Sequence, residues 1–341
     1  MRVAPMLAAR YLGPHQIEAI EIERPSIADE HALIRVSACG FCGSDLGIVA
    51  GLHPRAREPL TLGHEFCGTV EEIGVSNSDL RRGDFVAAYP LISCGMCLVC
   101  RMGLPHVCKS LRLYGIDADG GMAEFVRIPL ANLRRLPVTM TPIEGAVVEP
   151  LAVAVHGVLM AAIEHTNTAV VLGAGPIGLL TALVAKSRGI SSVVVSDVLP
   201  FRLELAKNLG FEIAAAGKEL EAAVREKTRD EGADLIFECA GSPSTALAMT
   251  SLVRSRGTII NLGVFKKPSE VNLQAINFKE IRLLGSRVYT ESDFAEAIKC
   301  AQQLPVAKIV THTFPLHQVK EAFSRFREGT DVCKVLLLPN G

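Results

Sequence analysis

The stretch Val170-Val171-Leu172-Gly173-Ala174-Gly175-Pro176-Ile177-Gly178 decides the fold of much of this 341-residue chain. An expected strand, Ala169 to Leu172, runs into the pattern G-x-G-x-x-G, which opens a helix expected over Ile177 to Ser187. The first glycine allows a tight turn, the second lets a pyrophosphate approach the backbone, and the third lets helix and strand pack closely. The helix N-terminus adds free N–H groups and partial positive charge. The sequence therefore predicts a dinucleotide site formed by Gly173, Gly175, Pro176, Ile177 and Gly178.

An acidic residue follows the next expected strand, Ser192 to Ser196. It is Asp197, and a carboxylate at that position can accept hydrogen bonds from both ribose hydroxyls of the adenosine. The same charge would repel the 2′-phosphate of NADP, so the sequence predicts NAD. Arg202, in a helix expected around Phe201 to Leu209, is a further candidate for cofactor contact. A flavin or other nucleotide fold, or a plain helix cap at Asp197, is the alternative interpretation.

The pattern of the chain changes near residue 150. Beyond it, expected strands and helices alternate, with two more buried strands at Asp234 to Cys239 and Thr258 to Leu262. Repeated βα units of this length predict a doubly wound parallel sheet. Before residue 150, Gly and Pro separate short β-like runs, which is typical of an irregular β-rich domain. These runs are Ala32 to Ala38, Gly68 to Ile73, Asp84 to Ala88 and Ala123 to Ile128.

The βα alternation ends around Gly285. The tail holds helices expected near Phe294 to Gln303 and His317 to Arg327, and a strand at Lys334 to Leu338. We expect residues 1–152, completed by 290–341, to form a catalytic domain, and residues 153–289 to form the cofactor domain.

The composition excludes several classes of protein. With 35 basic and 36 acidic residues the formal net charge is −1, so nothing attracts DNA phosphates or an anionic membrane. No uninterrupted apolar run reaches the roughly 18 residues of a membrane span, and Met1 to Arg10 has too short an apolar stretch for a signal peptide. We expect a cytoplasmic protein that acts on a small molecule, without nucleic acid or membrane as partner.

Four of the ten cysteines lie close together in the sequence. Short spacings of two residues let one loop wrap a metal ion, and zinc takes four thiolates tetrahedrally in structural sites. An iron–sulfur cluster, which also uses four cysteines, is the competing interpretation. The sequence predicts structural zinc at Cys94, Cys97, Cys100 and Cys108.

A second set of metal-binding residue types is spread more widely. Cys42-Gly43-Ser44-Asp45 follows an expected strand, Gly63-His64-Glu65 comes about twenty residues later, and Glu149-Pro150-Leu151 stands much further on. Thiolate, imidazole and carboxylate are all zinc ligands, and a catalytic zinc keeps one position open. Taken singly, these residues also fit a buried thiol, a core histidine and two helix-end charges.

Together these motifs resemble those of the zinc-containing medium-chain dehydrogenases, and within them the polyol branch of sorbitol, threonine and 2,3-butanediol dehydrogenases. The resemblance covers nearly the whole chain. It is carried by Cys39-Gly40-Phe41-Cys42-Gly43-Ser44-Asp45, by Gly63-His64-Glu65-Phe66-Cys67-Gly68, by the cysteine quartet, and by Glu149-Pro150-Leu151 with the glycine-rich loop and Asp197. It implies an α/β protein with a GroES-like catalytic domain and a Rossmann domain, an active site in the cleft between them, and a homotetramer or homodimer.

The resemblance also implies roles for individual residues. Cys42, His64 and Glu65 are expected to bind a catalytic zinc, and Glu149 either to ligate that zinc or to hold its water. Ser44 is the expected first proton acceptor from the substrate hydroxyl. Many relatives carry a histidine where this chain has Gly47, so the onward proton path is open between the cofactor ribose, a water held by Glu149, and His53.

The expected reaction is NAD-linked oxidation of a secondary hydroxyl of a polyol or sugar alcohol to a ketone. Activity on 2,3-butanediol, L-threonine or a sugar-alcohol phosphate is the alternative. Arg287 and Tyr289 follow the last expected strand of the cofactor domain and are candidates for substrate binding; a surface arginine and a packed tyrosine are the alternative interpretation.

Overall fold

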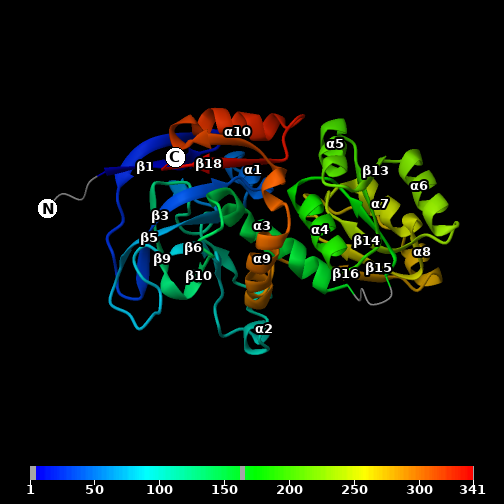
Figure 1. The fold of residues 1–341 in the computed structure, drawn as a ribbon, viewed down its shortest axis with the longest axis horizontal. Coiled ribbons are helices and arrows are strands. Elements are labelled where there is room, and N and C mark those ends of the chain that lie inside the picture. The colour runs from blue at the N-terminus through cyan, green and yellow to red at the C-terminus, as the bar shows by residue number, and fades with distance from the viewer. Residues whose placement is uncertain (1–4, 162–165, 341) are drawn as a thin grey trace. The chain divides into compact units, whose positions relative to one another are not determined.

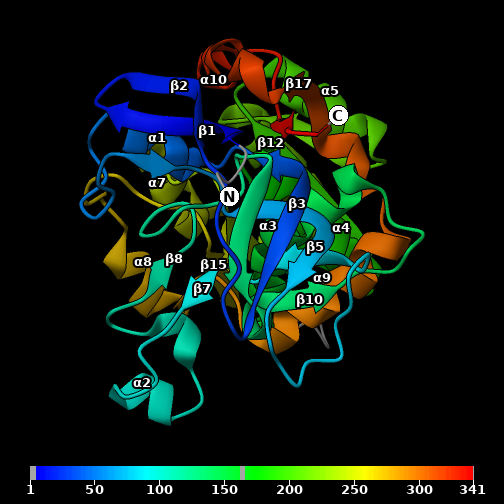
Figure 2. The ribbon, with the colours of Figure 1, turned by 90° about the vertical axis from the view of Figure 1, so that its left-hand side faces the viewer.

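The computed structural model describes residues 5–161 and 166–340, so the first four residues of the N-terminal segment considered above lie outside it. The chain divides into two compact units. One consists of Met1–Glu149 together with Thr290–Gly341, and the other of Pro150–Tyr289. Figures 1 and 2 show the elements of each unit from two directions.

The second unit is built on a parallel sheet. Within its described residues the strand order is β13-β12-β11-β14-β15-β16, and every neighbouring pair is parallel. Counted along the chain this order is 3-2-1-4-5-6, which confirms the predicted doubly wound Rossmann sheet. The strands are β11 (Thr168–Leu172), β12 (Ser192–Asp197), β13 (Glu212–Ala215), β14 (Ala233–Glu238), β15 (Val253–Asn261) and β16 (Arg282–Gly285).

Helices flank this sheet (Figure 1). They are α4 (Pro176–Ser187), α5 (Pro200–Asn208), α6 (Lys218–Thr228), α7 (Pro243–Leu252) and α8 (Leu273–Phe278). Because a central parallel strand is covered on both faces, its residues are apolar without alternation. Every residue of β11 is accordingly buried, and this is why the sequence located the strand so closely.

The first unit is β-rich. Its larger sheet has the order β10-β6-β5-β3-β18-β17, with β9 also paired to β3. The tail strand β18 lies antiparallel to β3, so the C-terminal segment joins the same sheet as the N-terminal half. The strands are β3 (His31–Gly40), β5 (Glu65–Ile73), β6 (Phe85–Ala88), β9 (Phe125–Pro129), β10 (Leu133–Arg135), β17 (Val310–Pro315) and β18 (Lys334–Leu338).

Smaller elements complete this unit. A second sheet has the order β2-β1-β4, and a short hairpin pairs β7 with β8. Figure 2 shows the segment around α2 beyond that hairpin, away from the larger sheet. The elements are β1 (Pro5–Gly13), β2 (Gln16–Glu23), β4 (Leu60–Thr61), β7 (Leu91–Ile92), β8 (Arg112–Leu113), α1 (Gly43–Val49), α2 (Leu98–Arg101), α9 (Glu291–Gln303) and α10 (Val319–Glu328).

The helix α3 (Pro142–Leu159) contains the sequence boundary between the two units. The sequence did not identify it as a helix, because Pro150 lacks the N–H that an interior helical position donates. By length and composition α3 could cross a membrane, but 67% of its apolar window is buried inside the protein, as in the core helix of a folded domain.

Candidate active site and metal sites

Strand pairing brings the predicted catalytic ligands together. β3 and β5 run antiparallel with Gly40 opposite Glu65, so residues just after β3 meet residues at the start of β5. Cys42 is the N-cap of α1, and His64 and Glu65 stand at the entry to β5. One ligand atom from each of the three lies within 4.8 Å of the others. His64 and Glu65 are buried and Cys42 is half-buried.

The electrostatics of this group suit a cation. Burial lowers the pKa of His64, but a hydrogen bond and the charge of Cys42 more than offset that effect. Glu149 and Asp45 add further negative charge, and the pKa of His64 is held well above its usual value. The Nδ1 atom of His64 is buried and has no hydrogen-bond partner among the described residues. Thiolate, imidazole and carboxylate in one anionic group fit a catalytic zinc.

Ser44 and Glu149, the two predicted catalytic residues, come from different elements of the first unit. Ser44 lies in the first turn of α1, two residues after Cys42, and its buried Oγ has no hydrogen-bond partner in the described part of the chain. Glu149 lies in α3 and is 7% exposed. Its carboxylate interacts electrostatically with His64, although it is outside the three-residue ligand group. Both positions suit a group that contacts a bound hydroxyl or water.

Two residues that support the group were missed by the sequence reasoning. Asp45 is fully buried, and its carboxylate accepts a hydrogen bond from the Cys42 N–H at 2.8 Å, which fixes the start of α1. Burial raises the pKa of Asp45 to about 6. Lys334 is also buried, in β18, where its ammonium pairs with Glu65. A lysine inside the apolar run Val332 to Leu338 is the sequence signal that could have revealed it.

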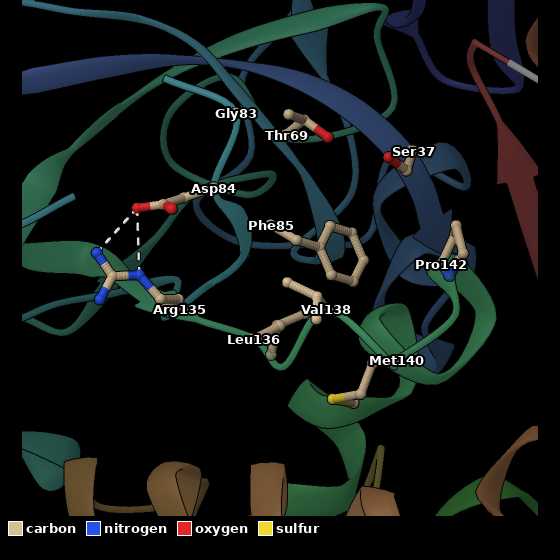
Figure 3. A pocket seen from close by; sticks show the side chains of 10 residues that line it. All are labelled: Ser37, Thr69, Gly83, Asp84, Phe85, Arg135, Leu136, Val138, Met140 and Pro142. Atoms are coloured by element: carbon tan, nitrogen blue, oxygen red, sulfur yellow. Dashed lines mark hydrogen bonds and ion pairs between the residues drawn. The ribbon is translucent and has the colours of Figure 1, made fainter. Parts of the chain in front are cut away.

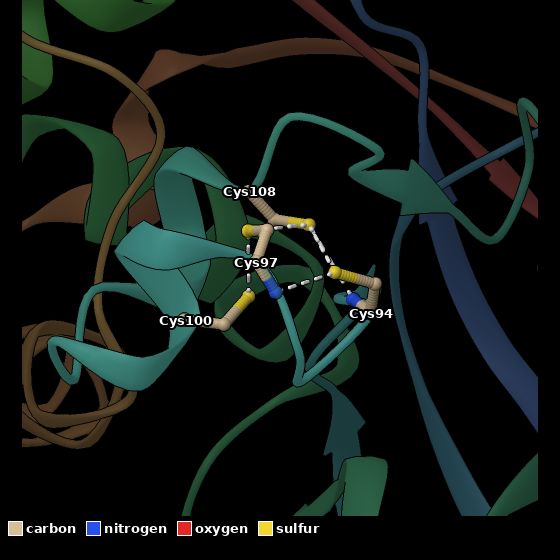
Figure 4. A group of neighbouring side chains, drawn as sticks. All are labelled: Cys94, Cys97, Cys100 and Cys108. Atoms are coloured by element: carbon tan, nitrogen blue, oxygen red, sulfur yellow. Dashed lines mark hydrogen bonds between the residues drawn. The ribbon is translucent and has the colours of Figure 1, made fainter.

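The cysteine quartet forms a second, separate donor group (Figure 4). The Sγ–Sγ distances are 3.4 Å for Cys97–Cys100, 3.8 Å for Cys97–Cys108 and 3.4 Å for Cys94–Cys108. Backbone N–H donors lower the pKa of Cys97 to about 6 and also lower that of Cys94. The four cysteines of the quartet are not joined by disulfides. Burial raises the pKa of Cys100 to about 12, so the thiolate is favoured at Cys94 and Cys97 but not at Cys100. Four converging cysteine sulfurs fit a structural zinc.

The glycine-rich loop has the geometry that the sequence predicts. Gly173 follows β11 with φ +102°, and Gly175 is the N-cap of α4. A Cβ at Gly178 would overlap the carbonyl oxygen of Gly173, so helix and strand approach too closely for any side chain there. A Cβ at Gly175 would meet only Arg202 Nη1, at 3.8 Å. The space above Gly175 is therefore open to a ligand.

Asp197 lies at the end of β12 and is 8% exposed. Its two carboxylate oxygens accept hydrogen bonds from the N–H groups of Ala174, at 2.7 Å, and Leu199, at 2.9 Å. These bonds fix the carboxylate against the glycine-rich loop, and each oxygen retains further acceptor capacity. Arg202 Nη1 lies 3.9 Å from the same carboxylate. The structure thus brings together the residues predicted to bind the cofactor.

The two candidate substrate residues differ in their surroundings. Arg287 is exposed, whereas Tyr289 has no exposed surface, which favours a packing role for the tyrosine. His53 is half-buried, and its Nδ1 accepts a hydrogen bond from the Ala56 N–H at 3.2 Å. Neither Arg287 nor His53 belongs to the metal-ligand groups.

A hollow of about 330 Å³ in the first unit is a weaker candidate for a site (Figure 3). Its charged lining residues are Asp84 and Arg135, and the arginine donates to the carboxylate through Nε at 3.1 Å and Nη2 at 2.9 Å. These charges neutralise each other, and none of the predicted ligands lines the hollow. We therefore assign no chemistry to it.

Comparison with known proteins agrees with this geometry. Residues 28–138 match the model of the alcohol dehydrogenase GroES-like domain, and residues 176–303 match that of the zinc-binding dehydrogenases. The chain is 34% identical over 338 residues to 2-dehydro-3-deoxy-L-galactonate 5-dehydrogenase of Pseudoalteromonas atlantica, covering 97% of this chain and 98% of the relative.

Two solved structures show the same fold. A zinc-binding dehydrogenase from Sinorhizobium meliloti bound to NADP superposes with a TM-score of 0.89 at 31% identity, over 98% of this chain and 100% of the other. An alcohol dehydrogenase of Escherichia coli, RspB, complexed with NADH, superposes with a TM-score of 0.90 at 31% identity, over 98% of this chain and 99% of the other.

Proposed function

Since the chain belongs to the zinc-type alcohol dehydrogenases, with a GroES-like and a zinc-binding dehydrogenase domain, we propose that it oxidises a secondary hydroxyl of a polyol or sugar alcohol to a ketone with NAD. The observation that carries the proposal is the buried ligand group of Cys42, His64 and Glu65. Simple alcohol dehydrogenases tend to use a second cysteine where this chain offers a carboxylate, and the polyol branch resembles this chain in that respect.

The residues of the first unit divide the chemistry among them. Zinc held by Cys42, His64 and Glu65 would supply the Lewis acidity that lowers the pKa of an alcohol hydroxyl. Ser44 Oγ, buried and without a partner in the described residues, takes up the hydroxyl proton and passes its own proton onward in the same step, to the cofactor ribose, a water held by Glu149, or His53. Glu149 holds a neighbouring water or hydroxyl through its carboxylate. The nicotinamide would accept the hydride, which is the chemistry of the cofactor and not of the protein.

Polar groups around the reacting carbon favour a hydroxyl-rich substrate. While Ser44 binds the reacting hydroxyl, the Glu149 carboxylate can accept a hydrogen bond from a second hydroxyl, and sites that bind hydroxyls in this way discriminate against analogues that lack them. Ethanol offers no second hydroxyl for such a hydrogen bond. The structure therefore supports a polyol better than a primary monoalcohol.

A substrate panel tests the proposed function. With NAD present, kcat/KM should be at least about tenfold higher for the best polyol or diol than for ethanol, since one unpaired polar group costs about 1–3 kcal/mol. The panel contains ethanol, 2-propanol, 2,3-butanediol, sorbitol, xylitol, galactitol, hexitol phosphates and threonine, and NADH absorbance is the measurement. If a primary monoalcohol were the best substrate, the polyol assignment would be wrong.

A sugar acid is the second candidate substrate, and a specific observation favours it. The Pseudoalteromonas relative is named for oxidation at carbon 5 of a deoxy sugar acid, which is a secondary hydroxyl. Arg287 is one of the substrate residues that the sequence predicts, and a guanidinium binds a carboxylate through two parallel hydrogen bonds. Adding galactonate to the panel separates the two candidates: a sugar acid would lose efficiency in Arg287→Ala, whereas an uncharged polyol would not.

The proposed preference for NAD rests on Asp197. Two unit charges about 4 Å apart repel by roughly 4 kcal/mol at an effective dielectric near 20. Screening and the Arg202 guanidinium, 3.9 Å from the Asp197 carboxylate, offset part of this repulsion. Asp197 is held in place by two backbone hydrogen bonds. We expect kcat/KM to be about a hundredfold higher with NAD than with NADP. Asp197→Asn keeps the size of the side chain, and the amide oxygen can still accept the hydrogen bond from Ala174 N–H. Because the substitution removes the negative charge, it should reduce the ratio of kcat/KM with NAD to kcat/KM with NADP. Equal efficiency with both cofactors in the unmodified enzyme would reject the role of Asp197.

A further inference from the structure

A buried lysine from the tail of the chain reaches the predicted zinc ligands. Lys334 begins β18 and is 1% exposed. Its ammonium pairs with Oε2 of Glu65 and donates a hydrogen bond to the carbonyl oxygen of Phe41 at 2.8 Å. A Cβ at Gly40 would overlap that same Glu65 oxygen, so the glycine leaves the space that the ion pair occupies. The pair is thus built from three elements that meet at the site.

Lys334 lies among several acidic groups of the predicted metal site. Lys334 interacts electrostatically with Cys42 and Glu149 as well as with Glu65. A thiolate and two carboxylates carry three negative charges, and the buried Asp45 beside them is a fourth acidic group. A divalent metal alone does not balance these charges, and the lysine adds a positive charge. A purely structural pair at this depth would be replaceable by apolar side chains, because burying two charges costs about as much as their attraction returns.

The two oxygens of Glu65 are therefore not equivalent. Oε2 accepts a charge-assisted hydrogen bond from the ammonium, which weakens it as a ligand and favours Oε1 as the oxygen that binds a metal. A carboxylate free of such a partner can bind a metal through both oxygens. That second bond would fill the open coordination position on which a catalytic zinc depends.

We propose that Lys334 is a positioning residue of the catalytic metal site, which holds Glu65 so that it offers the metal a single oxygen and keeps the substrate position open. The inference rests on the proposed zinc site. Lys334 does not contact the substrate; it acts through Glu65. It follows that loss of the ammonium makes the metal more tightly bound and the enzyme less active, because Glu65 then binds through both oxygens.

The test uses the whole enzyme with cobalt in the catalytic site, whose visible absorption reports coordination number. In Lys334→Met we expect the cobalt band to weaken and shift, removal of the metal by a chelator to be about tenfold slower, and kcat to fall at least tenfold. Lys334→Arg keeps the charge and should retain the original spectrum. Lys279→Met is the control: Lys279 is a half-buried lysine that donates only to the carbonyls of Thr250, Ser251 and Val253. It should leave the cobalt spectrum unchanged.

A double variant shows whether Lys334 acts through Glu65. In the Glu65→Gln background, Lys334→Met should change neither the spectrum nor the rate of metal loss further, because the carboxylate it restrains is gone. In Lys334→Met alone, the buried Glu65 carboxylate loses its ion-pair partner, and the protein can become unstable. The double variant avoids this loss because Gln has no charge, so it tests the inference even if the single variant does not fold.

Three results would overturn the inference: an unchanged cobalt spectrum in folded Lys334→Met, a metal that dissociates faster in parallel with lost thermal stability, or additive effects in the double variant. Failure of the proposed function is recognised separately. In that case the unmodified enzyme would itself lack zinc at Cys42 and His64, or would oxidise no secondary alcohol.

Discussion

Replacing Cys42 by alanine should remove one of two zinc ions per chain and lower turnover at least about a thousandfold. Cys42 supplies the thiolate of the group that includes His64 and Glu65. A catalytic metal ion contributes several kcal/mol of charge stabilisation in the transition state, and each 1.4 kcal/mol corresponds to about tenfold in rate. Zinc content by elemental analysis and NADH production by absorbance are the two measurements.

Two other cysteine variants make this result specific. Cys97→Ala should remove the other zinc ion, because that ion is bound by the separate quartet. It should also lower the thermal stability of the segment from Cys94 to Cys108, which that ion holds together. Cys67→Ala is the matched control: Cys67 is a buried thiol in β5, it donates to the carbonyl of Pro142 at 3.2 Å, and it belongs to neither ligand group. It should retain both ions. Full activity in a protein without metal would refute the zinc mechanism altogether.

Local sequence signals predicted the parallel sheet well because burial on both faces leaves a simple pattern. β11, β12 and β14 are short apolar runs followed by glycine or an acid, and the structure confirms all three. The hairpin of β1 and β2 was missed, since its residues mix buried, partly buried and exposed positions with no clean alternation. The helix α3 was missed because of Pro150.

Local sequence patterns predicted the candidate site less well than the sheet, because the residues of the site come from segments that are distant in the sequence. The spacing of Cys42, His64 and Glu65 does not itself imply proximity; it is the antiparallel register of β3 and β5 that supplies it. Their assignment came from the family resemblance. Lys334 lies 269 residues from Glu65, and only the pairing of β18 with β3 brings them together. Whether a side chain is buried likewise depends on tertiary packing. The sequence therefore did not distinguish the exposed Arg287 from the buried Tyr289.

Alanine at Gly175 and at Gly178 should both impair binding of NAD, but for different physical reasons that stability measurements can separate. Gly175 has φ −72°, which any L-residue adopts, and its Cβ would make only one ordinary contact, with Arg202. Gly175→Ala should therefore change the free energy of unfolding by less than about 0.5 kcal/mol. Its methyl group would nevertheless occupy the space in which a pyrophosphate approaches the helix N-terminus.

At Gly178 the added methyl group would overlap the carbonyl oxygen of Gly173, which belongs to the backbone and cannot move aside as a side chain would. Overpacking of this kind costs about 1–3 kcal/mol, so Gly178→Ala should lower the melting temperature and also weaken NAD binding, through a displaced α4. Calorimetric titration with NAD and thermal unfolding without it provide the comparison. Gly175→Ala should weaken NAD binding at least tenfold at unchanged stability. If it bound NAD as tightly as the unmodified protein, the pyrophosphate would not pass over Gly175, and the dinucleotide site would have to lie elsewhere on the sheet.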